Sequence, residues 1–423
     1  MSASSSVPPS TEPVSSIETA CCVVGCGPAG AMLALLLARR GVPVVLLEAA
    51  KDFNRDFRGD TIHAPILELM EQLGLVERLL QLPHSKITKM VTRFDGHYRS
   101  TGDLNGMDLK YPFTALIPQA RFLEFITEEA QRYTHFHLIM QARVRELIIE
   151  DGVVRGVRYR EGEHWHEVRA QLTVGADGRS SHVRALANLT FKPLARPVEL
   201  LWFRLEKSPE DFKHICALSS YSPGNHGAII NRDAYWQVSY YIPQKGYAQV
   251  RAAGLPAFRE KVTKELPETQ AYIDQLQDWK QLSHLTVQIG RVDRWYIPGL
   301  LLLGDAAHVM SPIGGFGINL AVQDAVVAAN VLSGPLKSGQ VQVSDLEAVQ
   351  RQRMPPTHTY QNYQVTAQRL LVEPYLEPGP RLHLTRLLTR LPIQRVVFTR
   401  LVARGAGTVR VDGLPEPDQV QSR

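Results

Sequence analysis

The sequence predicts an α/β fold, with a Rossmann-like dinucleotide-binding domain, an inserted and mainly antiparallel β domain, and a helical C-terminal region. A glycine-rich turn at residues 25–30 lies between a predicted strand and a predicted helix. A second glycine loop, at residues 312–317, follows an apolar run and opens another helix. Between them, residues 196–245 are strand-like and rich in aromatic side chains. We therefore expect one nucleotide domain whose two parts are separated by a sheet.

The composition is typical of a globular protein of enzyme size. The 423 residues are 44% hydrophobic and 21% charged, and this length predicts two or three domains. A net charge of +5 is too mild to favour nucleic-acid binding, which needs a concentrated basic patch. Three of the four cysteines, Cys21, Cys22 and Cys26, crowd the first strand and turn. We expect buried thiols in a reducing cytoplasm, not disulfides.

We expect no targeting signal in the N-terminal segment. Residues 1–18 are rich in Ser and Pro and have no apolar core, which predicts a disordered tail. No uncharged apolar run in the chain reaches the ~20 residues that a membrane span needs. The sequence therefore predicts a soluble, cytoplasmic protein.

The first predicted unit is strand, glycine turn, helix and strand. The apolar residues 20–24 precede the turn Gly-Cys-Gly-Pro-Ala-Gly, and a helix with a small-residue face follows it. The next strand, residues 44–47, ends at Glu48, which lies 18 residues after Gly30. This spacing is that of a dinucleotide fingerprint, in which the acid accepts hydrogen bonds from the adenosine ribose. The fingerprint does not distinguish NAD from FAD.

The following segments alternate between strands and helices. Residues 86–104 are predicted to form two strands joined by an Asp-Gly turn, and residues 119–131 a helix. An alternating stretch at 144–174, broken twice by acid-glycine turns, predicts a β-meander that ends in Gly-Ala-Asp-Gly at 175–178. Arg58 follows the first unit directly. It is interpreted either as a solvated loop charge or as a cofactor contact.

The inserted region returns the chain to the nucleotide domain. Residues 255–280 are predicted to be helical, and a strand is expected at 285–290. The region before them holds a group of aromatic residues on predicted strands: Trp202, Phe203, Tyr221, Tyr235, Trp236, Tyr240 and Tyr241. We expect this sheet to cover a ligand site and exclude water from it.

The second half of the nucleotide site is predicted at residues 300–333. The apolar residues 300–303 have the pattern of a strand buried on both faces, and Asp305 lies at its carboxyl end. The loop at 312–317 then opens a helix whose partly positive N-terminus points toward the predicted ligand. One face of this helix carries small residues at i+4 spacing: Gly317, Ala321, Ala325 and Ala329.

The C-terminal region is predicted to be helical and basic. A helical segment at 344–371 is expected to be interrupted at the Pro-Pro pair, residues 355–356. Residues 381–410 contain seven arginines and no acid. Such a run of charge is most often a solvated helix face, and its Leu and Val positions could equally pack on the protein, on a partner or on an anionic membrane surface; membrane contact is the less favoured of these. The motif His-Trp-His at 164–166 is interpreted as a solvent-facing strand, so no metal site is predicted.

Three glycine-acid signals, ending at Glu48, Asp177 and Asp305, stand in order along the chain. Together they resemble the class A FAD-dependent monooxygenases, the para-hydroxybenzoate hydroxylase-like aromatic hydroxylases. The resemblance covers residues 19–345 and is more specific for the fold than for the substrate. It implies this domain division after the tail: an FAD-binding domain at 19–85, 105–188 and 287–343, a substrate-binding β domain at 86–104 and 189–286, and a helical, Arg-rich region at 344–423.

The resemblance also implies contacts with FAD, residue by residue. Gly25, Gly27 and Gly30 match the glycines that hold the pyrophosphate, Glu48 the acid at the adenosine ribose, and Asp305 the acid at the ribityl chain. The loop at 312–317 matches the loop beside the isoalloxazine ring. The other expected contacts are Pro28, Ala29, Ala49, Arg58, Gln119, Asp177, Gly178, Gly304, Pro312, Gly315, Gly317, Ile318 and Asn319.

The activity implied by the resemblance is NAD(P)H-dependent hydroxylation or epoxidation of a small apolar, aromatic or polyketide-like substrate, with dioxygen, through a flavin 4a-hydroperoxide. NADH or NADPH is expected to visit the flavin transiently, because no second dinucleotide fingerprint occurs after residue 190. No side-chain acid or base is required, since the flavin carries the hard chemistry. Arg58, His308 and Pro312 are the only candidates for a direct catalytic role.

Substrate contacts are expected on the inserted sheet, where the candidates are Trp202, Tyr221, Trp236 and Tyr240. Alternate residues of a strand face opposite sides, so several of these must be plain core residues. Two other functions fit the resemblance: a flavin-dependent reductase of isoprenoid-type double bonds, and a non-catalytic prenyl-binding relative. Homodimer formation is left open by the sequence.

Overall fold

The computed structural model describes residues 15–54, 60–208, 216–232, 234–391, 393–407 and 409–413. Arg58, a predicted cofactor contact, lies outside the described residues. Strand β1 begins at Ser15, so the prediction of a disordered tail through residue 18 is wrong for its last four residues. These residues pair in parallel with β11, where Ser15 Oγ also lies 2.8 Å from His166 Nδ1. The partner strand, which is distant in sequence, orders them.

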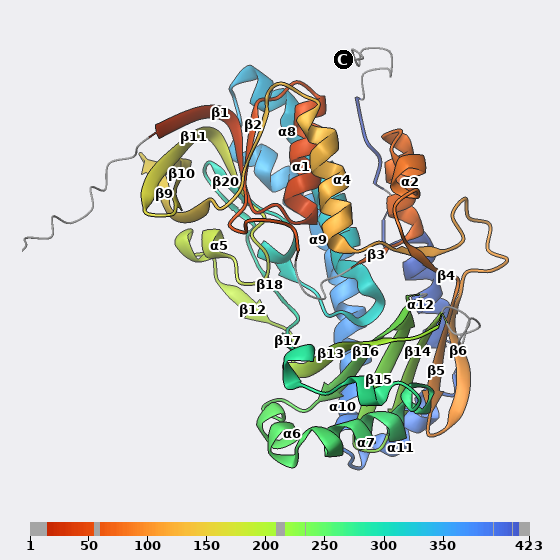
Figure 1. Ribbon diagram of the computed structural model, residues 1–423. Coiled ribbons are helices and arrows are strands. Elements are labelled where there is room, and N and C mark those ends of the chain that lie inside the picture. The colour runs from red at the N-terminus through yellow and green to blue at the C-terminus, as the bar shows by residue number, and fades with distance from the viewer. Residues whose placement is uncertain are drawn as a thin grey trace, which may run out of the picture.

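One eight-stranded sheet forms the Rossmann-like part of the molecule (Figure 1). Its path is β19-β20-β11-β1-β2-β8, and every pair from β20 to β8 is parallel. β9 and β10 extend antiparallel from β11, which confirms the predicted meander. The strands are β1 (Ser15–Val24), β2 (Val44–Leu47), β8 (Phe136–Ile139), β9 (Arg143–Glu150), β10 (Val153–Glu161), β11 (His164–Gly175), β19 (Tyr296–Ile297) and β20 (Leu300–Leu302).

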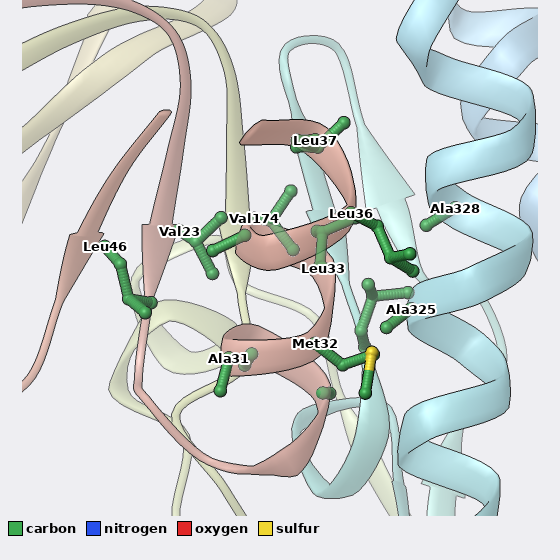
Figure 2. Packing of buried hydrophobic residues seen from close by; sticks show 14 of the residues in the cluster. Val23, Ala31, Met32, Leu33, Leu36, Leu37, Leu46, Val174, Ala325 and Ala328 are labelled. Carbon is green, nitrogen blue, oxygen red and sulfur yellow. The ribbon is translucent and has the colours of Figure 1, made fainter. Parts of the chain in front are cut away.

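Three helices pack side by side against this sheet: α1 (Pro28–Arg39), α4 (Gln119–Gln131) and α8 (Phe316–Ser338) (Figure 1). α4 begins and ends at the predicted residues. In Figure 2, Leu36 of α1 faces Ala325 and Ala328 of α8. The small residues on α8 let the two helix axes approach closely, because they leave little side-chain volume between them.

Helix α8 is the core helix of the molecule. The segment Ile313–Ser338 is long and apolar enough to cross a membrane by length and composition, but 78% of its most apolar window is buried inside the fold. The side chains of Cys21, Cys22 and Cys26 are also buried, as expected, and burial raises the pKa of the Cys21 thiol to about 12. Core packing therefore explains both the apolar composition of α8 and the burial of the three cysteines.

The second large sheet has seven strands in the order β17-β13-β16-β15-β14-β5-β6. All neighbours are antiparallel except β14 and β5. The β5–β6 turn falls at Asp95 and Gly96, as predicted, and both have positive φ. The strands are β5 (Lys89–Phe94), β6 (His97–Asp103), β13 (Val198–Glu206), β14 (Ala217–Ser222), β15 (Asn225–Asn231), β16 (Tyr235–Ile242) and β17 (Ser283–Val287).

The two faces of this sheet have different partners. One face packs on α6 (Tyr247–Ala253) and α7 (Leu255–Glu265), and the other packs on α10 (Glu373–Leu376) (Figure 1). The predicted helix at 255–280 is right only as far as Glu265. Beyond it the chain forms three short 3₁₀ turns, Pro267–Thr269, Ile273–Gln275 and Trp279–Gln281, and Ile273 and Leu276 join the apolar cluster on this face of the sheet.

Short elements connect these layers. Two small sheets have the orders β3-β7-β4 and β12-β18-β21, and β17 with β18 accounts for the strand expected at 285–290. The remaining strands are β3 (Thr61–Ile62), β4 (Ser85–Ile87), β7 (Thr114–Leu116), β12 (Phe191–Pro193), β18 (Gly290–Val292) and β21 (His308–Val309). The remaining helices of this part are α2 (Ala64–Gln72), α3 (Val76–Leu79) and α5 (His182–Leu186).

The C-terminal region is helical, but the predicted interruption at the Pro-Pro pair is wrong. α9 (Val343–Ala367) runs through both prolines. Tertiary hydrogen bonds hold it on either side of them: Arg353 donates to Asp324, and Gln364 donates to the Ser311 and Ile313 carbonyls. These bonds offset the local cost of proline in a helix.

A π-helical segment, Gln368–Val372, links α9 to α10, and the chain continues through α11 (Arg381–Leu388) and α12 (Ile393–Arg404). α11 and α12 each bury one side, with Leu382, Leu401 and Val402 in the core. Their outer side exposes Leu384 and Leu387 as well as arginines. The Arg-rich segment thus packs on the protein and is also partly a solvated face.

Candidate active site

A single cavity of about 830 Å³ is lined by residues of both large sheets and of α8. Most of the residues expected from the sequence to bind the cofactor lie on its wall. They are Gly25, Gly27, Pro28, Ala29, Glu48, Ala49, Gln119, Asp177, Gly178, Gly304, Asp305, Pro312, Gly315, Gly317 and Ile318. The fold therefore brings together three glycine-acid segments that are far apart in the sequence.

The glycine turn before α1 forms part of the cavity wall. Gly25 has a φ of +100°, and a Cβ on Gly30 would lie 2.0 Å from the Gly25 carbonyl oxygen. Gly30 therefore shapes the turn from inside instead of lining the cavity. A Cβ on Gly27 would have no neighbour closer than 3.8 Å, so this glycine leaves open space. α1 also starts without a side-chain cap or an acidic residue in its first turn, which suits an anionic ligand.

Glu48 lies at the end of β2, next to this turn, and is 6% exposed. Its two carboxylate oxygens accept hydrogen bonds from the backbone N–H groups of Cys26 and Ala50, each at 2.9 Å. A carboxylate oxygen can accept more than one hydrogen bond, so Glu48 is fixed in place and can still accept ribose hydroxyls.

Asp177 lies on the cavity wall, but its carboxylate is used within the protein. One oxygen accepts from the N–H groups of His182 and Val183, at 2.7 and 3.0 Å, and the other accepts from the Ser181 hydroxyl. The side chain thus fastens the first turn of α5 to the loop that carries Gly178. A Cβ on Gly178 would meet nothing within 4 Å, so the loop leaves room beside the cavity.

The Gly-Asp turn after β20 rests on a buried ionic cluster. Asp324 of α8 accepts from the Gly304 N–H at 3.2 Å, from His308 Nε2 at 2.6 Å and from Arg353 Nε at 2.7 Å. Burial alone would raise the pKa of Asp324, but the charges and hydrogen bonds of His308 and Arg353 outweigh it and lower the pKa below its ordinary value. Asp305, the next residue of the turn, lines the cavity.

His308 does not line the cavity. Its side chain is 1% exposed and is bound to Asp324, so its place is that of a support for the Gly-Asp turn and not of a catalytic group. Pro312 does lie on the cavity wall.

Asn319, which does not itself line the cavity, ties the loop at 312–317 to residues 61–63. Asn319 accepts from the His63 N–H at 2.9 Å and donates to the carbonyls of Thr61 and Gly315, at 2.9 and 2.8 Å. α8 follows with Gly315 as its N-cap, again without a side-chain cap or an acidic residue in its first turn. Two uncapped helix starts, those of α1 and α8, thus reach the same cavity.

Some lining residues were not found from the sequence. His63, buried beside this loop, has its pKa lowered by burial to about 3, against a raising hydrogen bond with the Gly314 backbone. It is therefore neutral at physiological pH. Arg143 and Arg145 line the cavity from β9, near Ala49. No local motif marks these residues, because only the packing of β9 brings them to the site.

The candidate substrate residues fall on opposite faces of the seven-stranded sheet. Trp202 and Tyr221 line the cavity, whereas Trp236 and Tyr240 belong to the core between the sheet and α7. The expectation that several of the four are core residues is confirmed. Tyr241, next to Tyr240 in the chain, lines the cavity: alternation puts it on the opposite face from Tyr240, and the register of β16 against β13 makes that the face of Trp202.

Substituting Tyr240 and Tyr241 one at a time tests which face of the sheet each side chain occupies. Tyr240 donates to Asn225 Oδ1 at 2.5 Å, so Tyr240→Phe is expected to lower the free energy of unfolding by about 0.5–1.5 kcal/mol and to leave ligand binding unchanged. The matched Tyr241→Phe variant is expected to keep the stability and change the affinity for the substrate. Urea denaturation and ligand titration check the pair, and the opposite pattern would contradict this assignment of faces.

The cavity fits FAD. Carboxylates stand at two places along it, Glu48 and Asp305, and uncapped helix N-termini provide positive ends for the pyrophosphate and for the pyrimidine edge of the ring. Gly27, Gly178 and Gly317 leave space where any Cβ would narrow the cavity. Among the residues that the structure describes, no group of three or more His, Cys, Asp or Glu is placed to hold a metal ion.

Comparison with known proteins agrees with this geometry. The FAD binding domain family matches residues 18–359. The 6-methylpretetramide 4-monooxygenase of Streptomyces rimosus is 32% identical over 408 residues, which cover 94% of this chain and 95% of that protein. The rifampicin monooxygenase of Streptomyces venezuelae is 30% identical over 307 residues, 72% of this chain; the match spans about three fifths of that longer protein, 61%.

Solved structures show the same fold. PqsL of Pseudomonas aeruginosa, a probable FAD-dependent monooxygenase, matches with a TM-score of 0.74 and 20% sequence identity. The match covers 88% of this chain and 100% of PqsL. The arrangement of the two large sheets and the helices around them is therefore one that solved structures already show.

Proposed function

This chain belongs to the FAD binding domain family of FAD-dependent aromatic monooxygenases, and from that premise we propose that it hydroxylates a polycyclic aromatic, polyketide-like substrate with dioxygen and NAD(P)H. The substrate class is suggested by the 6-methylpretetramide and rifampicin monooxygenases, which match this chain at 32% and 30% identity. The residue assignments rest on their places in the cavity.

One observation carries the proposal: the dinucleotide site and the aromatic face of the second sheet share one continuous cavity. The Glu48 and Asp305 ends would hold the two halves of FAD, and Trp202, Tyr221 and Tyr241 line the part next to the 312–317 loop. Ile313 of this loop packs in the same apolar cluster as these three side chains. A substrate in this part of the cavity would therefore lie against the loop that is expected to hold the flavin ring.

Bound FAD would supply hydride acceptance and oxygen activation, and the chain's own residues supply binding, orientation and exclusion of water. The positive end of α8 would stabilise negative charge at the edge of the ring. Apolar and aromatic side chains of the second sheet would keep water from the reacting atoms. Buried His63 and His226 are neutral, so neither adds a charge that would compete with this field.

The test is oxygen transfer by the purified, FAD-loaded protein. 6-Methylpretetramide and other polycyclic phenols are offered with NADH and, separately, with NADPH under ¹⁸O₂. We expect one of the compounds to stimulate NAD(P)H oxidation and to gain one ¹⁸O atom, detected by mass spectrometry. Stimulated oxidation without label in any product, or saturation of an isoprenoid alkene without oxygen uptake, would contradict the proposal.

The two alternative functions have less support. The reductase of isoprenoid-type double bonds is not favoured, because the similar proteins are monooxygenases. A non-catalytic prenyl-binding relative would not need the dinucleotide site, yet Glu48 and Asp305 still line the cavity. Protein that stays colourless after FAD is added would support that second alternative.

A further inference from the structure

A row of stacked rings crosses the cavity face of the second sheet. Tyr221, His226 and Tyr241 are directly opposite one another on β14, β15 and β16. The His226 ring lies 3.8 Å from the Tyr221 ring at an interplanar angle of 9°, and 4.2 Å from the Tyr241 ring at 21°. Phe94 of β5 extends the row, stacked on Tyr221 at 5.1 Å. Both faces of the imidazole are therefore covered, and only its edge can reach the cavity that it lines.

The other hydrogen bond of His226 fixes which nitrogen carries the proton. Nδ1 lies 2.9 Å from the Ser220 carbonyl oxygen, and a carbonyl can only accept, so Nδ1 is the N–H donor. Burial lowers the pKa of His226 to about 4, against the raising effect of this hydrogen bond, so the ring is neutral at physiological pH. Nε2 consequently carries a lone pair.

His226 is 2% exposed and lines the cavity, and its hydrogen bond to the Ser220 carbonyl uses Nδ1, so Nε2 is the ring nitrogen left for a ligand in the cavity. An acceptor that faces a cavity is satisfied by water or by a donor on the ligand, and a ligand that displaces the water without donating leaves the acceptor unpaired at a cost in affinity. The atom is an acceptor only, so the group that satisfies it must be a donor. Of the described lining residues, none on the seven-stranded sheet is an acid, so nothing there would neutralise a cationic donor.

We propose that His226 Nε2 accepts a hydrogen bond from a phenolic hydroxyl of the substrate, and so makes this enzyme selective for substrates with a free phenol against their O-methyl ethers. The proposal rests on the function proposed above, since it places the aromatic substrate between the ring row and the 312–317 loop. A flat substrate in this space would lie against the edge of the row, where a ring hydroxyl meets the exposed nitrogen. An ether cannot donate, and its methyl group would leave Nε2 unpaired.

The test compares 2-hydroxyanthraquinone with 2-methoxyanthraquinone as ligands of the FAD-loaded protein. Dissociation constants are taken from the change in the visible flavin spectrum on titration. We expect the wild-type protein to bind the phenol about 10- to 100-fold more tightly than the ether, which is the range for one hydrogen bond to a buried acceptor. Equal affinity for the two compounds, or no binding of either, would overturn the proposal.

Two variants identify the atom. His226→Phe keeps a ring in the stack but removes both nitrogens, whereas His226→Asn keeps a donor near the Nδ1 position and lacks Nε2. Both are expected to lose the preference for the phenol and to bind the ether within about threefold of wild type. If either folded variant keeps the preference, His226 is not the acceptor. Thermal melts and bound flavin establish which variants are folded.

The chain offers a matched control. His284 also lies on this sheet and stacks on a tyrosine, Tyr247, at 4.3 Å, but it does not line the cavity. His284→Phe is expected to keep the full preference for the phenol. Selective binding without oxygen transfer would contradict the proposed function alone, and oxygen transfer without selectivity would contradict the role of His226 alone.

Discussion

Asp324→Asn is expected to lower the free energy of unfolding by about 3–5 kcal/mol, because it leaves the Arg353 guanidinium buried without its counter-charge. Asp324 is 0% exposed, and its partners His308 and Arg353 are each 1% exposed, so water cannot replace the lost interaction. The Gly304 N–H also loses a carboxylate acceptor. Urea denaturation measures the loss, and bound flavin is expected to fall with it.

A matched surface variant provides the control. Asp274→Asn removes an acid that lies 3.4 Å from Arg259 but is 93% exposed, and its stability is expected to stay close to that of wild type. Equal losses in the free energy of unfolding of the two variants would show that the buried cluster stabilises the fold no more than the exposed ion pair does.

The pH dependence of the Asp324→Asn effect follows from the direction in which the pKa of Asp324 is shifted. The pKa of Asp324 is lower in the folded protein than its ordinary value of 3.8, so the ionised form stabilises the fold above that pH. This stability is lost as the pH falls through the still lower folded value. The difference between wild type and Asp324→Asn is therefore expected to be constant near neutrality and to narrow below about pH 4. A difference that grows on acidification would contradict the assignment.

Asp305→Ala is expected to yield folded protein that has lost most of its FAD. Each hydrogen bond from a ribityl hydroxyl to a charged carboxylate contributes about 1.5–3 kcal/mol, so the affinity for FAD should fall roughly 10- to 150-fold for each bond removed. Asp305 lines the cavity, and the Gly-Asp turn that carries it is held by Asp324. Absorbance of bound flavin after gel filtration measures the loss, and circular dichroism checks the fold.

Two further variants sharpen this prediction. Asp305→Asn keeps an acceptor without the charge, and we expect it to retain more flavin than Asp305→Ala. Asp293→Ala removes an exposed acid that pairs with Lys192 at the surface, and it should bind FAD as wild type does. Full flavin occupancy in Asp305→Ala would show that this aspartate is not the ribityl contact.

The dinucleotide half of the site was predictable from local sequence because each of its parts is short-range. Gly30 must be glycine to clear the Gly25 carbonyl, and Glu48 must end the next strand; both requirements act within one βαβ unit. The same holds for the turn at Asp95 and for the ends of α4, where the pattern of a few residues determines the structure.

The face of each aromatic side chain was not predictable in the same way. Trp236 and Tyr240 have the same residue character as Trp202 and Tyr221, but the register of β16 against β13 turns them toward α7. Because side chains alternate between the two faces of a strand, the sequence predicted that some of these aromatic residues face the cavity and the others face the core. It did not predict which set faces the cavity. Asp177 is similar: its motif placed it at the cavity, but the start of α5 takes up its carboxylate.

The sequence by itself thus determined the fold class, the FAD fingerprint and the Gly-Asp turn, since local backbone geometry requires those residues wherever the chain goes afterwards. Only the tertiary structure decided that β1 begins at Ser15, that α9 continues through two prolines, and that His226 lies between two tyrosines on the cavity wall. These features depend on partners far away in the sequence, such as β11, Asp324 and Tyr241. Their energies come from pairing and burial, which no local pattern encodes. Those distant contacts also form the wall of the cavity that is proposed to contact the substrate, next to the glycine loop at the start of α8.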